Sequence, residues 1–259
     1  MISLVKRTWR MRHFALYMII GQLKGFAAVQ LLGYAWWILE PLALTVTYTF
    51  VIRGVFQRGG PDLPVLILMG MLPWRWTSNA IAEGISSIRR SSGLVHAGYL
   101  PKTIFPLVSL GTGGVRFLVA FLAVTLALGL FTPYVVGANL WALPLAMLLQ
   151  LLFNLGMALV FSHFGAYSHD TANIWNIFGR VWFYFSPIMY ERPMLNGIWQ
   201  VVYDLNPMVA VVAVYRWAVM GHSLPTPGNM VSLAVFTVGS LLWGAYLHNK
   251  HDLHYAKVI

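Results

Sequence analysis

Four charged residues lie within long apolar stretches of this sequence: Glu40, Arg75, Arg116 and Arg180. An ionised side chain that faces lipid is costly, so such residues usually face a protein interior or a water-filled path. Two interpretations stay open for each of the four. The side chain either pairs with another charge or reaches a helix end, or it contacts a ligand on a path through the molecule.

No residues are arranged for nucleotide hydrolysis or another covalent reaction. A G-x-x-x-x-G-K-[ST] loop is missing, and the glycines Gly111, Gly113 and Gly114 lack the accompanying lysine, so helix packing explains them better. The seven Asp and Glu residues are scattered along the chain, and there are no cysteines. We therefore predict no catalytic residue and no cofactor bound by this chain.

The eight histidines do not follow the spacing of a metal site on a helix. His163 and His169 flank a short stretch with Asp170, which we interpret as a solvated connection in preference to a metal site or proton relay. The sequence predicts no metal site.

Aromatic residues make up 15% of the chain and gather in several pairs. Tyr and Trp often form belts at membrane interfaces, which is one interpretation. The other is a conduit whose aromatic faces stack against sugar rings, where many weak contacts allow each sugar to leave again. For this conduit we predict a lining of Trp36, Trp74, Trp76, Phe183 and Tyr184.

The composition predicts an all-α integral membrane protein with a single domain over residues 1–259. Hydrophobic residues make up 59% and charged residues 9%, against about 25% charged residues in a soluble domain. The net charge of +10 comes from Lys and Arg that flank apolar runs, so it does not indicate a nucleic-acid partner.

We predict six transmembrane helices, because a helix of about 20 apolar residues crosses a bilayer. They cover approximately residues 31–52, 63–82, 104–131, 140–162, 174–190 and 230–247.

Three segments lie between or before these crossings. Residues 1–30 have the pattern of an amphipathic helix in the membrane surface, and residues 83–102 form a polar stretch that we interpret as a loop holding a short helix. Residues 191–228 hold an apolar run, 208–220, that is too short to cross and is broken by Arg216. We interpret this region as a re-entrant or interfacial helical hairpin.

The distribution of Lys and Arg predicts the orientation. The N-terminal segment, the 83–102 stretch and the C-terminal tail together hold ten of these residues, and the opposite side holds four. Cytoplasmic connections carry the excess of positive charge, so both termini are predicted to be cytoplasmic.

Five segments resemble, in their order and spacing, the permease subunit of type-2 ABC exporters, particularly those that export O-antigen, capsular polysaccharide or teichoic acid. These are LGYAWWILEP (32–41), GMLPWRW (70–76), GLVHAGYLPKTIFPL (93–107), WFYFSPIMY (182–190) and LNPMVAVVAVYRWAVMG (205–221). The resemblance covers nearly the whole chain.

The resemblance implies a homodimer that works with two copies of a separate cytoplasmic ATPase, which uses ATP and Mg. It implies that residues 1–30 and a coupling segment, residues 83–105, lie at the cytoplasmic face and receive the motion of the ATPase. The coupling residues would be Gly93, Leu94, His96, Tyr99, Pro101 and Lys102. Residues 191–228 would form the outer re-entrant region, with Asn206, Pro207, Tyr215 and Arg216.

The expected function is therefore the membrane-spanning subunit of an ATP-driven exporter. It would move a lipid-linked O-antigen or capsule across the bacterial inner membrane, surrounded by membrane lipids. Export of teichoic acid, or of a small hydrophobic drug or lipid, is the first alternative. A proton-coupled transporter that uses Glu40, or an enzyme acting on a lipid carrier, is the second, although inverted repeats and clustered acids are missing.

Overall fold

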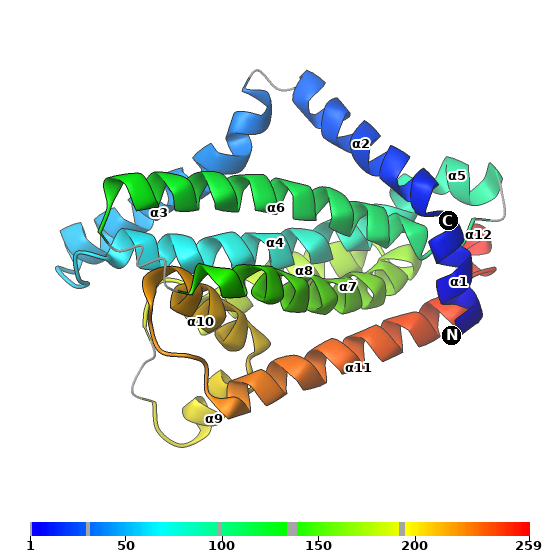
Figure 1. Ribbon diagram of the computed structural model, residues 1–259. Helices are drawn as coiled ribbons and strands as arrows, with labels where there is room; N and C mark the ends of the chain where they lie inside the picture. Colours follow the sequence, from blue (N-terminus) through cyan, green and yellow to red (C-terminus); the bar gives the residue numbers. More distant parts are fainter. Residues whose placement is uncertain (1, 30–31, 98–99, 134–138, 192–194) are drawn as a thin grey trace.

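The computed structural model describes residues 2–29, 32–97, 100–133, 139–191 and 195–259. Every regular element in these ranges is helical. The long helices run side by side in one bundle, and both chain termini lie at the same end of it (Figure 1). The all-helical prediction is confirmed.

Twelve α-helices make up this described part: α1 (Ile2–Arg10), α2 (Arg12–Val29), α3 (Trp36–Thr49), α4 (Leu63–Arg90), α5 (Ser92–Ala97), α6 (Ile104–Phe131), α7 (Leu143–Tyr167), α8 (Asp170–Phe185), α9 (Ile198–Leu205), α10 (Pro207–Met220), α11 (Pro227–His251) and α12 (Tyr255–Val258). A 3-10 turn, Gly33–Ala35, precedes α3, and a π-helical turn, Phe50–Val55, extends it.

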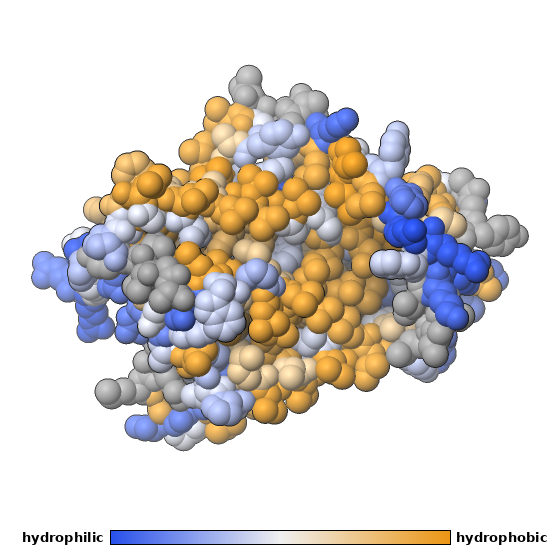
Figure 2. All heavy atoms as spheres, in the orientation of Figure 1, coloured by the Kyte–Doolittle hydropathy of each residue, from blue (hydrophilic) through white to orange (hydrophobic). Residues whose placement is uncertain are grey.

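Four helical segments are long and apolar enough to cross a membrane: Gly33–Val55, Ile104–Phe131, Leu140–Tyr167 and Pro227–His251. They coincide with four of the predicted crossings. Helices α9 and α10, a pair bent by 68°, are long and apolar enough only when they are taken together. If this pair counts as one span, the described residues hold up to five candidate spans. Hydrophobic side chains cover most of the middle of the bundle and hydrophilic ones gather towards its two ends (Figure 2).

Helices α4 and α8 correspond to the two other predicted crossings, 63–82 and 174–190. Helix α4 is long, but its polar residues, such as Arg75 and Asn79, lower its hydropathy. Helix α8 has 16 residues and ends at Phe185, because Ser186 precedes Pro187 and the residue before a proline is disfavoured in helical conformation. At about 1.5 Å per residue, α8 alone is shorter than the hydrocarbon core.

Helix α4 occupies the interior of the bundle, where it contacts α3, α6, α7, α8 and α10. Glycines allow the closest of these approaches. A Cβ atom added to Gly165 of α7 would lie 2.1 Å from the carbonyl oxygen of Ile85 in α4, and one added to Gly84 would lie 3.2 Å from Ala158 of α7. Small residues of this kind let helices pack closely in a membrane, where apolar surface alone provides little association.

Two predicted boundaries were wrong. Residues 83–90 are not part of a loop but continue α4, because Ile85 and Ile88 on this stretch are buried against the bundle. Only Ser91 therefore separates α4 from the short helix α5. The N-terminal helix predicted over residues 1–30 is two helices, since α1 ends at Arg10 and α2 starts at Arg12.

The close contact between α4 and α7 gives a first test. We expect Gly165→Ala to destabilise the protein by about 1–3 kcal/mol, since the added methyl group meets the rigid backbone of α4. The thermal midpoint of the purified full chain in detergent measures this effect. Gly129→Ala on α6 is the matched control, because no heavy atom lies within 4 Å of its added Cβ. Equal midpoints for both variants would contradict the proposed packing.

Candidate functional site

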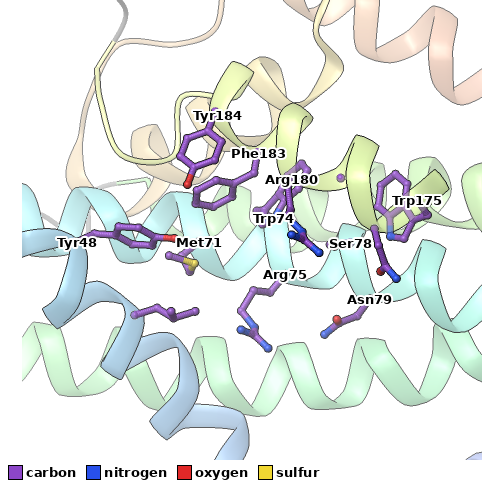
Figure 3. Close-up of a pocket in the computed structure, with 13 residues that line it drawn as sticks. Tyr48, Met71, Trp74, Arg75, Ser78, Asn79, Trp175, Arg180, Phe183 and Tyr184 are labelled. Atoms are coloured by element: carbon purple, nitrogen blue, oxygen red, sulfur yellow. The ribbon is translucent and has the colours of Figure 1, made fainter. Parts of the chain in front are cut away.

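A cavity of about 420 Å³ lies between α3, α4 and α8 (Figure 3). Its lining residues are Leu44 and Tyr48 from α3, Met71, Trp74, Arg75, Ser78 and Asn79 from α4, and Trp175, Asn176, Gly179, Arg180, Phe183 and Tyr184 from α8. The residues from α4 and α8 recur at intervals of three and four, so each helix presents one face. The bundle thus holds a polar and aromatic space among apolar helices.

The aromatic rings in this cavity hold one another in place. The ring of Trp74 meets those of Trp182 and Phe183 edge to face, with centroids 5.5 and 5.7 Å apart, and Tyr48 lies 5.9 Å from Phe183. Trp74 is buried, whereas Tyr184 is 61% exposed at the edge of the cavity. Edge-to-face contacts of this kind are a preferred arrangement of aromatic rings and fix their orientation.

A second cavity, of about 240 Å³, lies against α2, α3, α4 and α6, and Arg75 and Asn79 line both cavities. Trp36 and Trp76 line this second space. Trp76 is buried and stacked on Phe117 with ring centroids 4.4 Å apart. The five aromatic residues predicted to form one lining are therefore divided between two neighbouring cavities.

Pairing accounts for three of the four intramembrane charges. Glu40 and Arg75 form an ion pair with an N to O distance of 2.5 Å, and Arg116 pairs with Glu83 at 2.9 Å. Arg180 has no carboxylate oxygen within 4.0 Å among the residues that the structure describes, and its side chain lines the larger cavity beside Trp74 and Ser78 (Figure 3).

The sequence analysis missed Tyr48, Ser78, Asn79, Asn176 and Glu83. Helical spacing could have found Asn79 and Asn176, which lie four residues from Arg75 and Arg180. Nothing in the sequence alone marks Glu83 as the partner of Arg116, because the pair is 33 residues apart.

Asn206 joins the end of α8 to the start of α10. Its side-chain oxygen accepts hydrogen bonds from the Trp182 ring nitrogen and the Met208 backbone at 2.9 and 3.0 Å, and its amide donates to Ser186 Oγ. Pro207 is the first residue of α10. This arrangement caps α10 and sets the bend between α9 and α10.

Arg216 ties three segments together. Its guanidinium is buried and donates to the backbone carbonyls of Leu66, Ile188 and Tyr190 at 3.0 to 3.1 Å. Tyr215, beside it on α10, packs its ring edge to face with Phe121. Arg216 therefore ties α10 to α4, and Tyr215 packs α10 against α6.

The predicted coupling residues separate into exposed and buried groups. Gly93, Leu94 and His96 on α5 are exposed, whereas Pro101 and Lys102 are buried at the start of α6. Tyr99 lies outside the described residues.

The C-terminal tail packs against this segment. Asp252 Oδ1 accepts a hydrogen bond from the Lys102 backbone at 2.9 Å, and His96 Nε2 lies 3.1 Å from the carbonyl of Ala256. The hydroxyl of Tyr255 lies 2.8 Å from Nδ1 of His163. The tail thus connects α5, α6 and α7.

His163 does not lie in a solvated connection, as the sequence analysis expected, because α7 continues to Tyr167 and buries it. Burial raises the pKa of Tyr255 well above its ordinary value. The phenol therefore stays protonated, and its hydroxyl shares a hydrogen bond with Nδ1 of His163 whose donor is set by the imidazole tautomer. His169 and Asp170 lie at the start of α8 and remain exposed.

Comparison with known proteins places this geometry in context. The sequence model described as ABC-2 type transporter matches residues 15–220. The O-antigen export system permease protein RfbA of Myxococcus xanthus is 25% identical over 95% of this chain and 94% of its own length. RfbA of Klebsiella pneumoniae is 22% identical over 88% of both chains, and the polysialic acid transport protein KpsM of Escherichia coli is 26% identical over 85% of this chain and 86% of its own.

The contact between Tyr255 and His163 provides a test of the tail. Tyr255→Phe removes the hydroxyl and leaves the buried ring nitrogen of His163 unpaired, so we expect a loss of about 1–3 kcal/mol in stability, measured by thermal unfolding. Tyr246→Phe is the control, because that hydroxyl belongs to an exposed residue on α11. An unchanged midpoint for Tyr255→Phe would show that the hydrogen bond contributes nothing.

Proposed function

This chain belongs to the ABC-2 type transporter family, and from that membership we propose that it is the membrane-spanning subunit of an ATP-driven polysaccharide exporter. The cargo is a lipid-linked O-antigen or capsular polysaccharide that moves outward across the bacterial inner membrane. The observation that carries this proposal is the match to RfbA and KpsM along nearly the full length of both chains.

Energy comes from a partner in this proposal. The sequence has no phosphate-binding loop, so a separate ATPase would bind ATP and Mg, with two ATPase copies on a homodimer of this chain. The exposed face of α5, with Gly93, Leu94 and His96, is the surface we assign to ATPase contact. The chain itself makes and breaks no covalent bond.

We further propose six crossings, formed by α3, α4, α6, α7, α8 and α11. The bent pair α9 and α10 would be the outer re-entrant region, and α1 and α2 would lie at the cytoplasmic interface. An even number of crossings agrees with the position of both termini at one end of the bundle (Figure 1). The excess of Lys and Arg in the N-terminal segment and tail makes that end cytoplasmic.

The cavity between α3, α4 and α8 is the proposed substrate path. The rings of Trp74, Phe183 and Tyr184 offer apolar faces to sugars, and Arg180 offers a cation without a carboxylate partner in the described structure. A polymer that must move needs several weak contacts, since one tight pocket would hold it. Two copies of the chain would bring two such cavities to a shared path.

The pairing of Glu40 argues against the proton-coupled alternative. Its carboxylate lies 2.5 Å from the guanidinium of Arg75, so Glu40 is engaged in an ion pair inside the protein. A gene deletion distinguishes the export of polysaccharide from the export of a small drug or lipid. Deleting the gene should remove surface polysaccharide and leave drug tolerance unchanged.

Gentle purification of the chain from its native membrane tests the exporter proposal directly. We expect an ATPase subunit to copurify in equal amount, and lipid-linked glycan to stimulate its ATP hydrolysis. Recovery of the chain without any ATPase would argue for a transporter that does not use ATP. ATP hydrolysis that does not change when the glycan is added would argue for a different cargo.

Arg180 gives a more specific prediction. Arg180→Gln should raise the concentration of an anionic lipid-linked glycan that half-maximally stimulates ATP hydrolysis by about 10–150-fold, since a charge-assisted hydrogen bond contributes roughly 1.5–3 kcal/mol. Arg180→Lys keeps the charge and should stay within about threefold of the native value. Equal behaviour of the Gln and Lys variants would exclude a direct contact between Arg180 and the cargo.

A further inference from the structure

Three side chains from distant parts of the sequence converge at the end of the bundle opposite the termini: Asp62, Glu191 and His222. One ligand atom from each lies within 4.8 Å of the other two. We propose that these residues, here called the outer triad, bind Zn²⁺ or a similar divalent transition-metal ion. This inference goes beyond the transport function and does not depend on the identity of the cargo.

The backbone around the outer triad is held firmly. Asp62 directly precedes α4, and His222 follows Gly221, which ends α10 in the left-handed conformation with a φ of 70°. Arg216 binds the carbonyls of Leu66, one turn from Asp62, and Tyr190, the neighbour of Glu191. One buried side chain therefore fixes the segments that carry all three ligands, as supporting residues around metal sites commonly do.

The three donor groups are available for a ligand. In the described structure none of their side chains makes a hydrogen bond, and the contact between His222 Nε2 and Asp62 Oδ2 is 3.8 Å long. Two carboxylates this close repel each other unless a cation lies between them. The charge of Arg216 acts on Glu191 from a distance, but its guanidinium donates to three carbonyls and forms no salt bridge with Asp62 or Glu191.

The chemistry of the donors selects the metal. One imidazole nitrogen with two carboxylate oxygens suits Zn²⁺, whereas Ca²⁺ and Mg²⁺ take oxygen ligands. Ligand atoms around a tetrahedral zinc lie roughly 3.3–3.6 Å apart, given bonds of about 2.0–2.2 Å. The 3.8 Å contact is near this value, and small side-chain rotations would draw the third ligand in.

The access to the outer triad and its number of protein ligands also agree with a bound ion. A cavity of about 660 Å³ is lined by Asp62 and Glu191, and one of about 420 Å³ by Glu191 and His222, so the outer triad can be reached from two sides. Three protein ligands leave a fourth position for water. A bound ion would link the start of α4 to the ends of two other segments (Figure 1).

Zinc titration of the full chain tests the proposal. The chain is purified in detergent with an affinity tag that contains no histidine, stripped of metal with a chelator, and titrated with Zn²⁺ against a chromogenic zinc indicator. We expect one high-affinity equivalent per chain. His222→Ala, Asp62→Asn and Glu191→Gln should each weaken it by about 10–100-fold or more.

His169→Gln is the matched control, because this histidine lies beside Asp170 at the start of α8 and should leave the affinity unchanged. Zinc should also raise the thermal midpoint of the native and control proteins but not that of the three variants, whose midpoints without metal show that they still fold. Less than half an equivalent of zinc on the native chain, or native affinity in any one of the three variants, would overturn the assignment.

Discussion

The burial of α4 is the constraint on which the rest of this structure depends. This helix carries Arg75, Asn79 and Glu83 through an apolar bundle, and such residues are expensive wherever they face lipid. Five other helices surround α4, and Arg75 and Glu83 are part-buried in ion pairs, whereas Asn79 is exposed and lines the two cavities. The contact with α7 at Gly84 and Gly165 is a close backbone approach that holds α4 in this position.

The way in which the other helices pack against α4 also explains where the cavities lie. Helix α7 meets α4 backbone to backbone and leaves no space, whereas α3 and α8 approach it through large aromatic side chains and leave a gap of about 420 Å³. Arg75 lies between the two cavities and is fixed by Glu40, so its charge is neutralised within the protein. Arg180 has no such partner in the described residues and can respond to a ligand.

The sequence predicted those parts of the fold that depend on one segment at a time. The run 104–131 became α6 with the same bounds, because it is long and mostly apolar and its one proline, Pro106, lies in the first turn, where a helix tolerates it. The stretch 83–90 was misjudged as a loop because its helical state is stabilised by burial of Ile85 and Ile88, which a local pattern does not reveal.

The candidate site was predictable only in part for the same reason. Residue types suggested Trp74, Phe183 and Arg180, and the structure brings these three into one cavity. It puts Trp36 and Trp76 in the neighbouring cavity instead, because Trp76 stacks on Phe117 of α6. Such ring pairings depend on which helices pack together. Neither the spacing of residues nor the composition of the sequence reveals them.

Helix α4 also connects the two ends of the molecule mechanically. It is one helix of 28 residues, about 42 Å long, despite Pro73 within it. Gln150 of α7 donates to the carbonyl of Pro73 at 2.7 Å, so this side chain ties α7 to α4 at the position of the proline. Because α5 follows α4 directly and Arg216 fixes its other end, we infer that a displacement at α5 moves the cavity lining as part of a rigid body. In the proposed exporter, such a continuous element would connect the ATPase partner to the cavity that we propose as the substrate path.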